Sequence, residues 1–401
     1  NVLVIQAFSA LAAGGAIICA QYIGQKNKER ANESARQVLF IITAISIVVS
    51  LICLIFQKPL LRVIFGSVEA EVMRASEIYF FYTALSFPFI AAYDAAASIF
   101  RAQDNTKGPM IISMISNVMN IVGNAIMIWG FHMGVAGAAI ATLVSRIFCA
   151  VVVLIQLRKD RQPIVVRDYM KIRPNWSMIR RILGIGIPSG VENSMFQLGK
   201  LAIQSTVSTL GTAAIAAQAM TNILENLNGI AGIGVGIGLM TIVGQCMGAG
   251  RKDEAVYYIK KLCVIAEVII IVSCLTVFAL TKPVTMLGGM ERVSADMCFH
   301  MVMWITIVKP FVWVLSFITA YGLRAAGDVK FSMITSCITM WACRFCLCVF
   351  LIRVMGFGPM GVWIGMFADW TVRGIIFTWR FHSRKWLEYK GIYCLLYTSD
   401  A

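Results

Sequence analysis

The side chain most suited to binding an ion or a proton is that of Asp94, a carboxylate in the middle of the apolar run 78–100. An ionised group in hydrocarbon costs on the order of 2.5 to 3.5 kcal/mol on insertion scales, so intramembrane carboxylates usually mark ion or substrate pathways. The neighbouring alanines offer no counter-ion, and protonation or a bound cation would allow the carboxylate to be tolerated. We therefore predict that Asp94 binds a cation or a proton; a simple hydrogen bond to a neighbouring helix is the structural alternative.

Three asparagines on the next apolar run, 109–129, are further candidates for the same site. They are Asn117, Asn120 and Asn124. The last two are four residues apart and would share one face of a helix. Their amide oxygens are suitable acceptors, and we expect them to line one pocket with Asp94.

Glu192 and Lys200 form a second pair of candidates on the run 184–210. Eight residues are just over two helical turns, so these charges lie on similar faces but too far apart to pair directly. Glu192 follows Pro188, where a kink can open backbone carbonyls toward a cavity. We predict that Glu192 contacts a cationic substrate, with Lys200 as its counter-charge through water, and a purely structural pair is an equal alternative.

Other charges in apolar segments have less specific surroundings. Glu225 has asparagines nearby and marks either the mouth of a cavity or, as the favoured interpretation, a solvated helix start. Glu267 and Asp369 are lone carboxylates, and Arg344 and Arg373 are candidates to neutralise one of them, with the pairing left open.

Composition identifies the solvent of these segments as lipid. The 401 residues are 59% hydrophobic and only 14% charged, with a mean hydropathy of +0.78. Such a chain carries more apolar surface than a soluble domain buries. Eleven apolar runs are long enough to cross a hydrocarbon core of roughly 30 Å as helices: 2–23, 38–56, 78–100, 109–129, 135–157, 184–210, 213–247, 262–280, 298–323, 331–352 and 360–379. The fold class is therefore an all-α polytopic membrane protein.

The chain also repeats itself. At an interval of 224, four residues recur in the second half: Gln21, Gly24, Lys28 and Ala31 return as Gln245, Gly248, Lys252 and Ala255. The interval is 223 for Arg101 and Lys107, and again 224 for Gly134 and Gly137. Two homologous halves in a membrane usually indicate transport. The helix near Arg180 has no first-half partner, since that partner would begin about forty residues before residue 1. We therefore expect an N-terminally truncated sequence, with eleven of twelve helices.

Basic residues occupy alternate loops, which the positive-inside rule places in the cytoplasm. Halves with even numbers of spans enter the membrane in the same direction, as parallel repeats. The net charge of +15 is explained by topology and contact with anionic lipid, not by nucleic-acid binding. We divide the chain into an N-terminal lobe (1–157), a cytoplasmic linker (158–178), a C-terminal lobe of six helices (179–390) and a tail of doubtful origin (391–401).

The residues that carry the repeat resemble the multidrug and toxic compound extrusion (MATE) transporters of bacterial type. The resemblance lies in the runs 244–251, 323–328 and 134–142, and in Trp341 and Arg344. It implies twelve helices in two V-shaped lobes, a rocking cycle, and export of cationic amphiphilic drugs in exchange for sodium or protons. In relatives that couple through the N-terminal lobe, the helix that matches 109–129 often carries Asn followed four residues later by Asp. In this chain these two positions are Asn120 and Asn124.

The resemblance also bears on the coupling ion. In the sodium-coupled subgroup, carboxylates are expected at the positions of Phe196 and Trp313, and their replacement disfavours a sodium site of that type.

The glycines 134, 137, 358, 361 and 365 lie where small residues allow helices to pack closely.

Together these features predict an ion-coupled secondary antiporter in the cell inner membrane. No nucleotide-binding glycine loop or catalytic constellation occurs, so no enzymatic activity is expected. The expected partners are a small-molecule substrate, the coupling cation (H⁺ or Na⁺) and membrane lipid, for a monomer without nucleic acid, metal or other cofactor. Two alternatives remain. One is a lipid-linked oligosaccharide flippase, which requires a more basic cavity able to hold pyrophosphate, and the other is a membrane receptor or scaffold.

Overall fold

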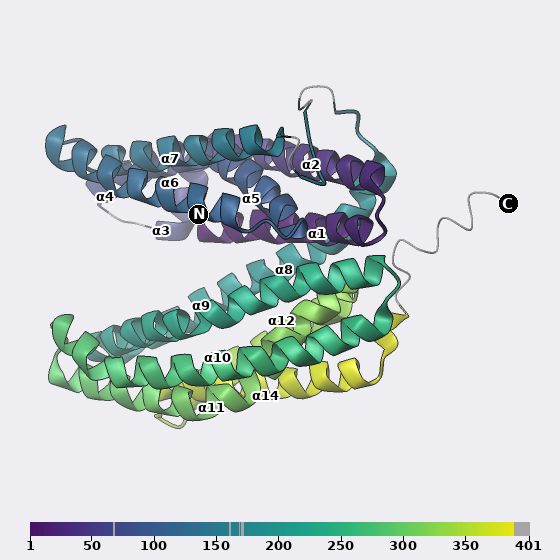
Figure 1. The fold of residues 1–401 in the computed structure, drawn as a ribbon. Coiled ribbons are helices and arrows are strands. Elements are labelled where there is room, and N and C mark those ends of the chain that lie inside the picture. The colour runs from purple at the N-terminus through teal and green to yellow at the C-terminus, as the bar shows by residue number, and fades with distance from the viewer. Residues whose placement is uncertain (67–68, 160–161, 168, 170–171, 389–401) are drawn as a thin grey trace. The chain divides into compact units, whose positions relative to one another are not determined.

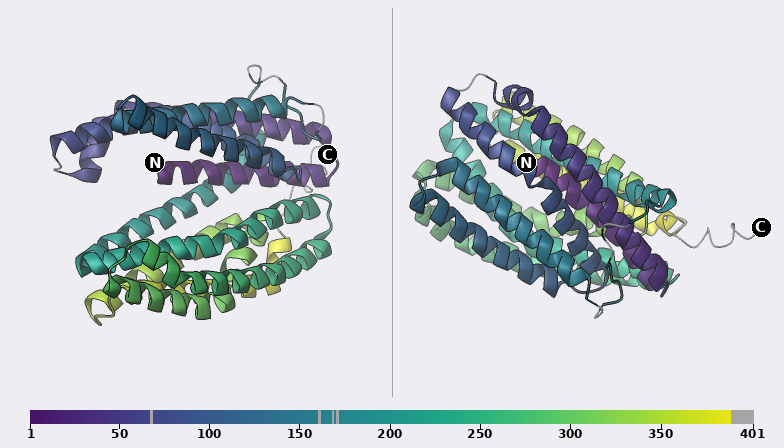
Figure 2. Two further views of the ribbon diagram at one scale, coloured as in Figure 1. Left: turned by 60° about the vertical axis from the view of Figure 1, so that its left-hand side comes forward. Right: turned by 90° about the horizontal axis from the view of Figure 1, so that it is seen from above.

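Every regular element of the described residues is a helix, and these residues contain no strand (Figure 1). The computed structural model describes residues 1–66, 69–159, 162–167, 169 and 172–388. The predicted tail, 391–401, lies outside them. Within each unit the helices run alongside one another as a bundle (Figure 2).

The described helices follow the order of the predicted runs. The first half contains α1 (Val2–Gly24), α2 (Lys28–Ile55), α3 (Gln57–Phe65), α4 (Ala70–Leu85), α5 (Phe87–Ala102), α6 (Lys107–Ala125), the π-helical turn η1 (Ile126–Gly130) and α7 (Gly134–Leu157). The second half contains α8 (Trp176–Val207), η2 (Ser208–Leu210), α9 (Thr212–Gly248), α10 (Lys252–Leu287), α11 (Arg292–Ala325), α12 (Val329–Thr339), the π-helical η3 (Met340–Cys346), α13 (Leu347–Arg353), α14 (Met360–His382) and η4 (Lys385–Leu387).

Two compact units divide the chain inside α8, at Gly190 and Val191. The sequence places this division earlier, in the linker 158–178. The first turns of α8 belong to the first unit because they pack closely on α1: a Cβ added to Gly14 would lie 2.7 Å from the Cα atom of Gly186. Two glycines at one crossing let the helix backbones approach without side chains between them.

Most of the predicted runs satisfy a stricter test for membrane spans. Eight described helices are long and apolar enough to cross a membrane, and a ninth span results if the bent pair α4 and α5 is counted as one. These two helices meet at 41°, next to Pro88. The remaining two runs lie in α8 and α14, which carry charged side chains of the second unit.

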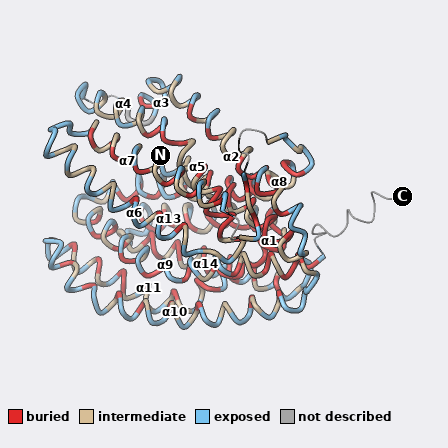
Figure 3. The backbone as a smooth tube through the Cα atoms, turned by 45° about the horizontal axis from the view of Figure 1, so that its top comes forward, coloured by how far each residue is buried: buried red, intermediate tan, exposed pale blue. Residues whose placement is uncertain are grey.

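The outer faces of the helices are apolar, as expected for contact with lipid. On α10, for example, Val264, Val268, Val272 and Leu275 are each more than half exposed and follow helical spacing. Buried residues form the interior of each bundle (Figure 3). Such a stripe would be unusual on a soluble protein but matches a lipid-facing surface.

The repeat is visible in the backbone as well as in the sequence. Five described residues of the first half have positive φ, and each has a positive-φ glycine 223 or 224 positions later: Lys26 and Gly250, Gly66 and Gly289, Asp104 and Gly327, His132 and Gly356, and Gly134 and Gly358. Positive φ is uncommon for residues other than glycine. The two halves therefore share their turn geometry as well as their motifs.

The repeated glycines have two different roles. A Cβ on Gly137 would lie 2.8 Å from the Cβ of Met127, and one on Gly365 would lie 2.8 Å from the carbonyl oxygen of Arg344, so these glycines allow close packing as predicted. Gly134 and Gly358 instead have φ values of +55° and +61° with open space around them. Their role is to turn the chain before α7 and α14.

Candidate functional site

The second unit contains two adjoining cavities, of about 290 Å³ and about 180 Å³. They are lined by α8, α9, α11, η3 and α14, and five residues line both: Lys200, Glu225, Asn226, Arg344 and Met366. We call the two together the C-terminal cavity. All of its lining residues belong to one compact unit.

Helical spacing brings the lining side chains together. On α11, Trp313, Phe317 and Tyr321 line the smaller cavity at intervals of four, and Lys309, one turn before them, shares their face. On α9, Gln218, Asn222, Glu225 and Asn226 form a second, polar stripe that lines the larger cavity. We call Trp313, Phe317 and Tyr321 on α11 the aromatic wall, and the polar stripe on α9 the amide wall.

A buried ion pair connects these two walls. The Nζ atom of Lys309 lies 2.8 Å from Oε1 of Glu225, with the lysine side chain fully buried and the glutamate side chain 15% exposed. The favoured interpretation of Glu225 as a solvated helix start was wrong, because α9 begins at Thr212 and Glu225 lies well inside it. Sequence reasoning missed Lys309, although a lone lysine in the apolar run 298–323 is itself a signal of a functional charge.

A second buried pair lies on α14. Arg373 donates a hydrogen bond to Asp369, one turn earlier, and both side chains are almost completely buried. Of the two lone carboxylates, Asp369 is the one that an arginine neutralises, a pairing that the sequence left unassigned. One oxygen of Asp369, Oδ1, has no partner among the described residues.

Both interior cations of these pairs also face aromatic rings. Lys309 Nζ lies 5.1 Å from the centroid of Trp313 and 5.9 Å from that of Trp370. The guanidinium carbon of Arg373 lies 4.7 Å from the ring centroid of Phe196 and 5.0 Å from that of Phe317. Within about 6 Å these are cation–π contacts. Phe196 and Trp313, the positions where the resemblance expects sodium-site carboxylates, both line the smaller cavity.

The exposed Lys200 and the buried Arg344 are the other two cations of the cavity, and neither forms an ion pair with the described residues. Arg344 is only 6% exposed, and its Nε atom is buried without a hydrogen-bond partner. It lies in the π-helical segment η3, a backbone form that is often found at functional sites.

Glu192 is paired elsewhere. It is 1% exposed, and its Oε1 atom accepts a hydrogen bond from Arg324 at 2.6 Å. The predicted role of Lys200 as its counter-charge is corrected accordingly: Arg324, near the end of α11, takes that place because α11 brings its guanidinium to α8.

In the first unit, Asp94 lies half-buried on α5 and forms neither an ion pair nor a hydrogen bond with the described residues. The positive charges that act on its carboxyl are those of Arg101 and Arg146. The adjacent Tyr93 hydroxyl donates a hydrogen bond to the carbonyl of Pro109, at the start of α6. Asp94 is thus a partly buried carboxyl with cations near it and no direct partner in the described structure.

The predicted asparagines interact with one another and not with Asp94. Asn124 donates to Asn120 at 3.2 Å, and Asn120 donates to the hydroxyl of Thr142 on α7 at 3.2 Å. Asn117 is exposed. No described hydrogen bond connects these amides to Asp94.

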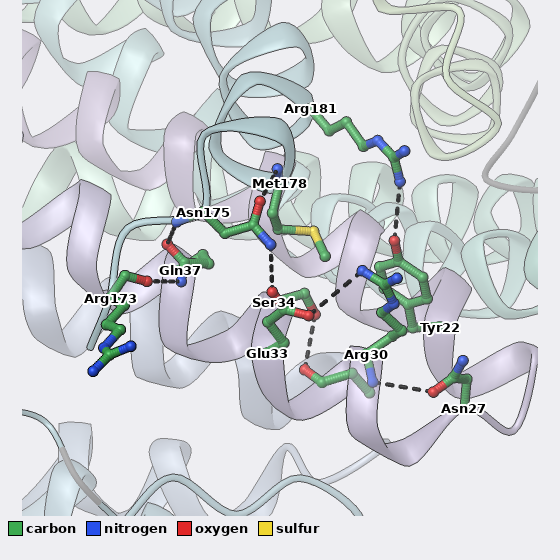
Figure 4. Close-up of polar contacts among 11 residues, drawn as sticks. Tyr22, Asn27, Arg30, Glu33, Ser34, Gln37, Arg173, Asn175, Met178 and Arg181 are labelled. Carbon is green, nitrogen blue, oxygen red and sulfur yellow. Dashed lines mark hydrogen bonds and ion pairs between the residues drawn. The ribbon is translucent and has the colours of Figure 1, made fainter. Parts of the chain in front are cut away.

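A cluster of polar contacts attaches the linker to α2 (Figure 4). The Gln37 side chain donates to the carbonyl of Arg173 at 2.7 Å and accepts from the backbone N–H of Asn175 at 3.1 Å. The Asn175 amide also donates to Glu33. Since Met178 follows at the start of α8 and is buried, these contacts fix the point where the chain enters that helix.

Comparison with known proteins shows which family has this sequence and fold. The profile of the MatE family matches residues 1–126 and 188–350. The chain is 26% identical over 400 residues to the uncharacterized transporter YisQ of Bacillus subtilis (strain 168), covering 97% of this chain and 86% of that protein. It is 26% identical over 380 residues to the probable multidrug resistance protein NorM of Thermotoga maritima, covering 93% of this chain and 80% of NorM.

Solved structures have the same fold. The outward-facing conformation of a multidrug resistance MATE family transporter of the MOP superfamily superposes with a TM-score of 0.85 at 18% identity, covering 96% of this chain and 86% of that one. The fold, the spans and the family profile agree. This chain is a multi-pass membrane protein and not an enzyme, and it belongs to the MATE family of transporters.

Proposed function

We propose that this chain is a secondary antiporter that exports small organic compounds in exchange for a coupling cation, by alternating access. The observation that carries the proposal is the C-terminal cavity, in which aromatic, amide and charged side chains meet inside a bundle of apolar helices. Cavities of this composition bind small ligands. The names of relatives, among them probable multidrug resistance proteins, support drugs as substrates.

Asp94 is the coupling residue in this proposal, and the proton is the coupling ion. Its carboxyl lies in a membrane-spanning segment without a direct partner in the described structure, so a change of protonation would alter the stability of the conformation that holds it. The aromatic residues Phe196 and Trp313 support proton over sodium coupling, since they stand where the sodium-coupled subgroup is expected to carry carboxylates.

The experiment is gradient-driven transport in proteoliposomes that contain the protein. Uptake or efflux of a panel of dyes with both charge signs, ethidium among them, is measured under an imposed proton gradient and then under an imposed sodium gradient. We expect transport under the proton gradient alone. Transport driven only by sodium would overturn the coupling assignment, and the absence of transport under both gradients would favour a receptor or scaffold.

A flippase for lipid-linked oligosaccharide is the second candidate, because Lys200 and Arg344 give the cavity two cations without carboxylate partners. A flippase of this kind must hold a pyrophosphate, which basic side chains bind. Transbilayer movement of a pyrophosphate-linked lipid in the same proteoliposomes, without any dye transport, would favour the flippase over the antiporter.

A further inference from the structure

We infer that the C-terminal cavity binds an amphiphilic organic anion, with its carboxylate or phosphate group held by Lys200 and Arg344 and its apolar body against the aromatic wall of α11. This inference rests on the proposed function and names the chemical class of the substrate. It differs from the cationic class that the family resemblance implies.

The first argument is the charge balance of the cavity. Two carboxylates, Glu225 and Asp369, already have partners in Lys309 and Arg373. Of the four cations in and beside the cavity, these pairs account for two, and no carboxylate of the described residues is paired with the others. A cationic substrate would therefore enter a site with surplus positive charge. An anion would neutralise it.

The second argument is the environment of Arg344. A guanidinium that is 6% exposed with an unpaired, buried Nε is costly to maintain without a counter-ion. The charge of Arg344 acts unfavourably on Lys200. The carboxylates that act favourably on Arg344, Asp369 and Glu225, are already paired with Arg373 and Lys309. The planar guanidinium fork matches a carboxylate or phosphate group, and the lysine adds a second point charge.

The third argument concerns the aromatic rings. A cationic drug would normally be held on the faces of tryptophan and phenylalanine. Here Lys309 lies within 5.1 Å of the Trp313 ring centroid, and Arg373 lies within 5.0 Å of the Phe317 ring centroid. The cations of the protein itself already occupy these positions. The rings remain available for apolar and edge contacts with an uncharged ligand body.

The distribution of the lining residues gives the ligand its amphiphilic character. The smaller cavity contributes aromatic side chains, among them Trp313, Phe317 and Trp370, and the larger cavity presents amides such as Asn222. Lys200 and Arg344 line both. A ligand with an anionic head and an aromatic or aliphatic body fills both cavities while placing its charge where they join.

The test uses three ligands with the same ring system and different charges. Binding of naphthalene-2-carboxylate, naphthalene-2-carboxamide and 2-naphthylmethylammonium is measured by calorimetry, with the full chain in phosphatidylcholine nanodiscs. We expect the carboxylate to bind at least roughly tenfold more tightly than the amide, and the ammonium compound to bind most weakly. Equal binding of the carboxylate and the amide, or tightest binding of the ammonium compound, would overturn the inference.

Variants then locate the anionic head. Lys200→Gln and Arg344→Gln should each weaken carboxylate binding by roughly tenfold, a loss typical of a charged hydrogen bond, and leave amide binding unchanged. Arg344→Lys, which keeps the charge and loses the fork, should have an intermediate effect. Lys260→Gln, at an exposed position on α10, is the matched control and should bind like the unsubstituted chain. Carboxylate binding that no cavity variant weakens would place the anion elsewhere.

Because the ligand series needs no variant, the inference stays testable if Arg344→Gln does not fold. Phosphatidylglycerol in the nanodisc distinguishes two sources of the anion. If phosphatidylglycerol weakens the binding of the naphthalene carboxylate and Arg344→Gln removes this competition, the site holds a lipid phosphate. If phosphatidylglycerol leaves the affinity for the carboxylate unchanged, the site holds a free organic anion. Binding does not require transport. Carboxylate binding without gradient-driven movement would refute export alone, whereas transport of cations without carboxylate binding would refute the anion site alone.

Discussion

Lys309 and Glu225, 84 residues apart in sequence, form an ion pair of 2.8 Å inside the second unit. The pair connects α11 to α9 at the point where the aromatic and amide walls of the cavity meet. A fully buried lysine in a bundle of apolar helices is tolerated only because its partner is fixed in place.

Removal of one member of this pair should destabilise the protein strongly. We expect Glu225→Gln to lower the free energy of unfolding by about 3 to 5 kcal/mol, because it leaves an uncompensated ammonium group in the interior. Thermal unfolding in detergent, followed by circular dichroism, measures the effect. The double variant Glu225→Gln with Lys309→Gln should lose less, since no isolated charge remains.

The exposed pair of Arg251 and Glu254 provides the control for that measurement. Its members are 66% and 49% exposed, so Glu254→Gln should change the free energy of unfolding by less than about 1 kcal/mol. Equal losses at both pairs would show that burial does not set the strength of the interior pair.

Gly365 should tolerate no side chain, because an added Cβ would lie 2.8 Å from the carbonyl oxygen of Arg344. We expect Gly365→Ala to displace η3 and to cost about 1 to 3 kcal/mol of stability, as overpacking does. Gly234→Ala is the matched control, since nothing lies within 4 Å of its Cβ position on α9. A shift in melting temperature for Gly234→Ala as large as that for Gly365→Ala would contradict this account of η3.

Asp94→Asn should abolish gradient-driven transport while the protein remains folded in the membrane. The amide keeps the shape of the side chain and removes its ability to bind and release a proton. Dye movement in proteoliposomes under a proton gradient measures the effect, and Glu267→Gln, which changes a carboxyl on α10 outside the C-terminal cavity, is the control. Normal transport by Asp94→Asn would remove this residue from the mechanism.

The linker should become accessible to protease when its attachment to α2 is broken. Gln37→Ala removes the hydrogen bonds to the backbone of Arg173 and Asn175, so trypsin should cleave the linker several-fold faster. Gln37→Glu keeps the acceptor for the Asn175 N–H and loses the donor, and its cleavage rate should lie between the two. Identical rates for all three proteins would mean that other contacts hold the linker.

Tyr169 gives the linker a titration that can be followed directly. Burial raises the pKa of the Tyr169 phenol to about 12, although the Arg158 charge lowers it, and the hydroxyl donates to the carbonyl of Leu154 at 2.6 Å. A raised pKa means that the contribution of this residue to stability is complete below about pH 10 and is lost as the pH rises toward 12. The absorbance change of phenolate, taken as the difference from Tyr169→Phe, should occur near pH 12. A midpoint near 10 would show that the phenol is solvated.

The sequence established the membrane solvent, the helical fold class and the duplication, because these depend on composition, run length and periodicity. It identified Asp369 and Arg373 as candidates for a pair, but the pairing itself came from the structure. The backbone conformation of the turns could not be predicted from composition or periodicity. That Lys26, Asp104 and His132 share positive φ with glycines of the second half is visible only when the turns are described.

The site itself needed the tertiary structure. Local sequence suggested that Glu192 and Lys200 act together and that Glu225 is solvated. The partners of Glu192 and Glu225 instead come from α11, 132 and 84 residues away along the chain, respectively. Which charge meets which depends on how helices pack, and no local spacing encodes it. The residues that can carry charge in the membrane were therefore determined by the sequence alone, whereas the tertiary fold decided that Glu192, Glu225 and Asp369 are neutralised and that Lys200 and Arg344 are not.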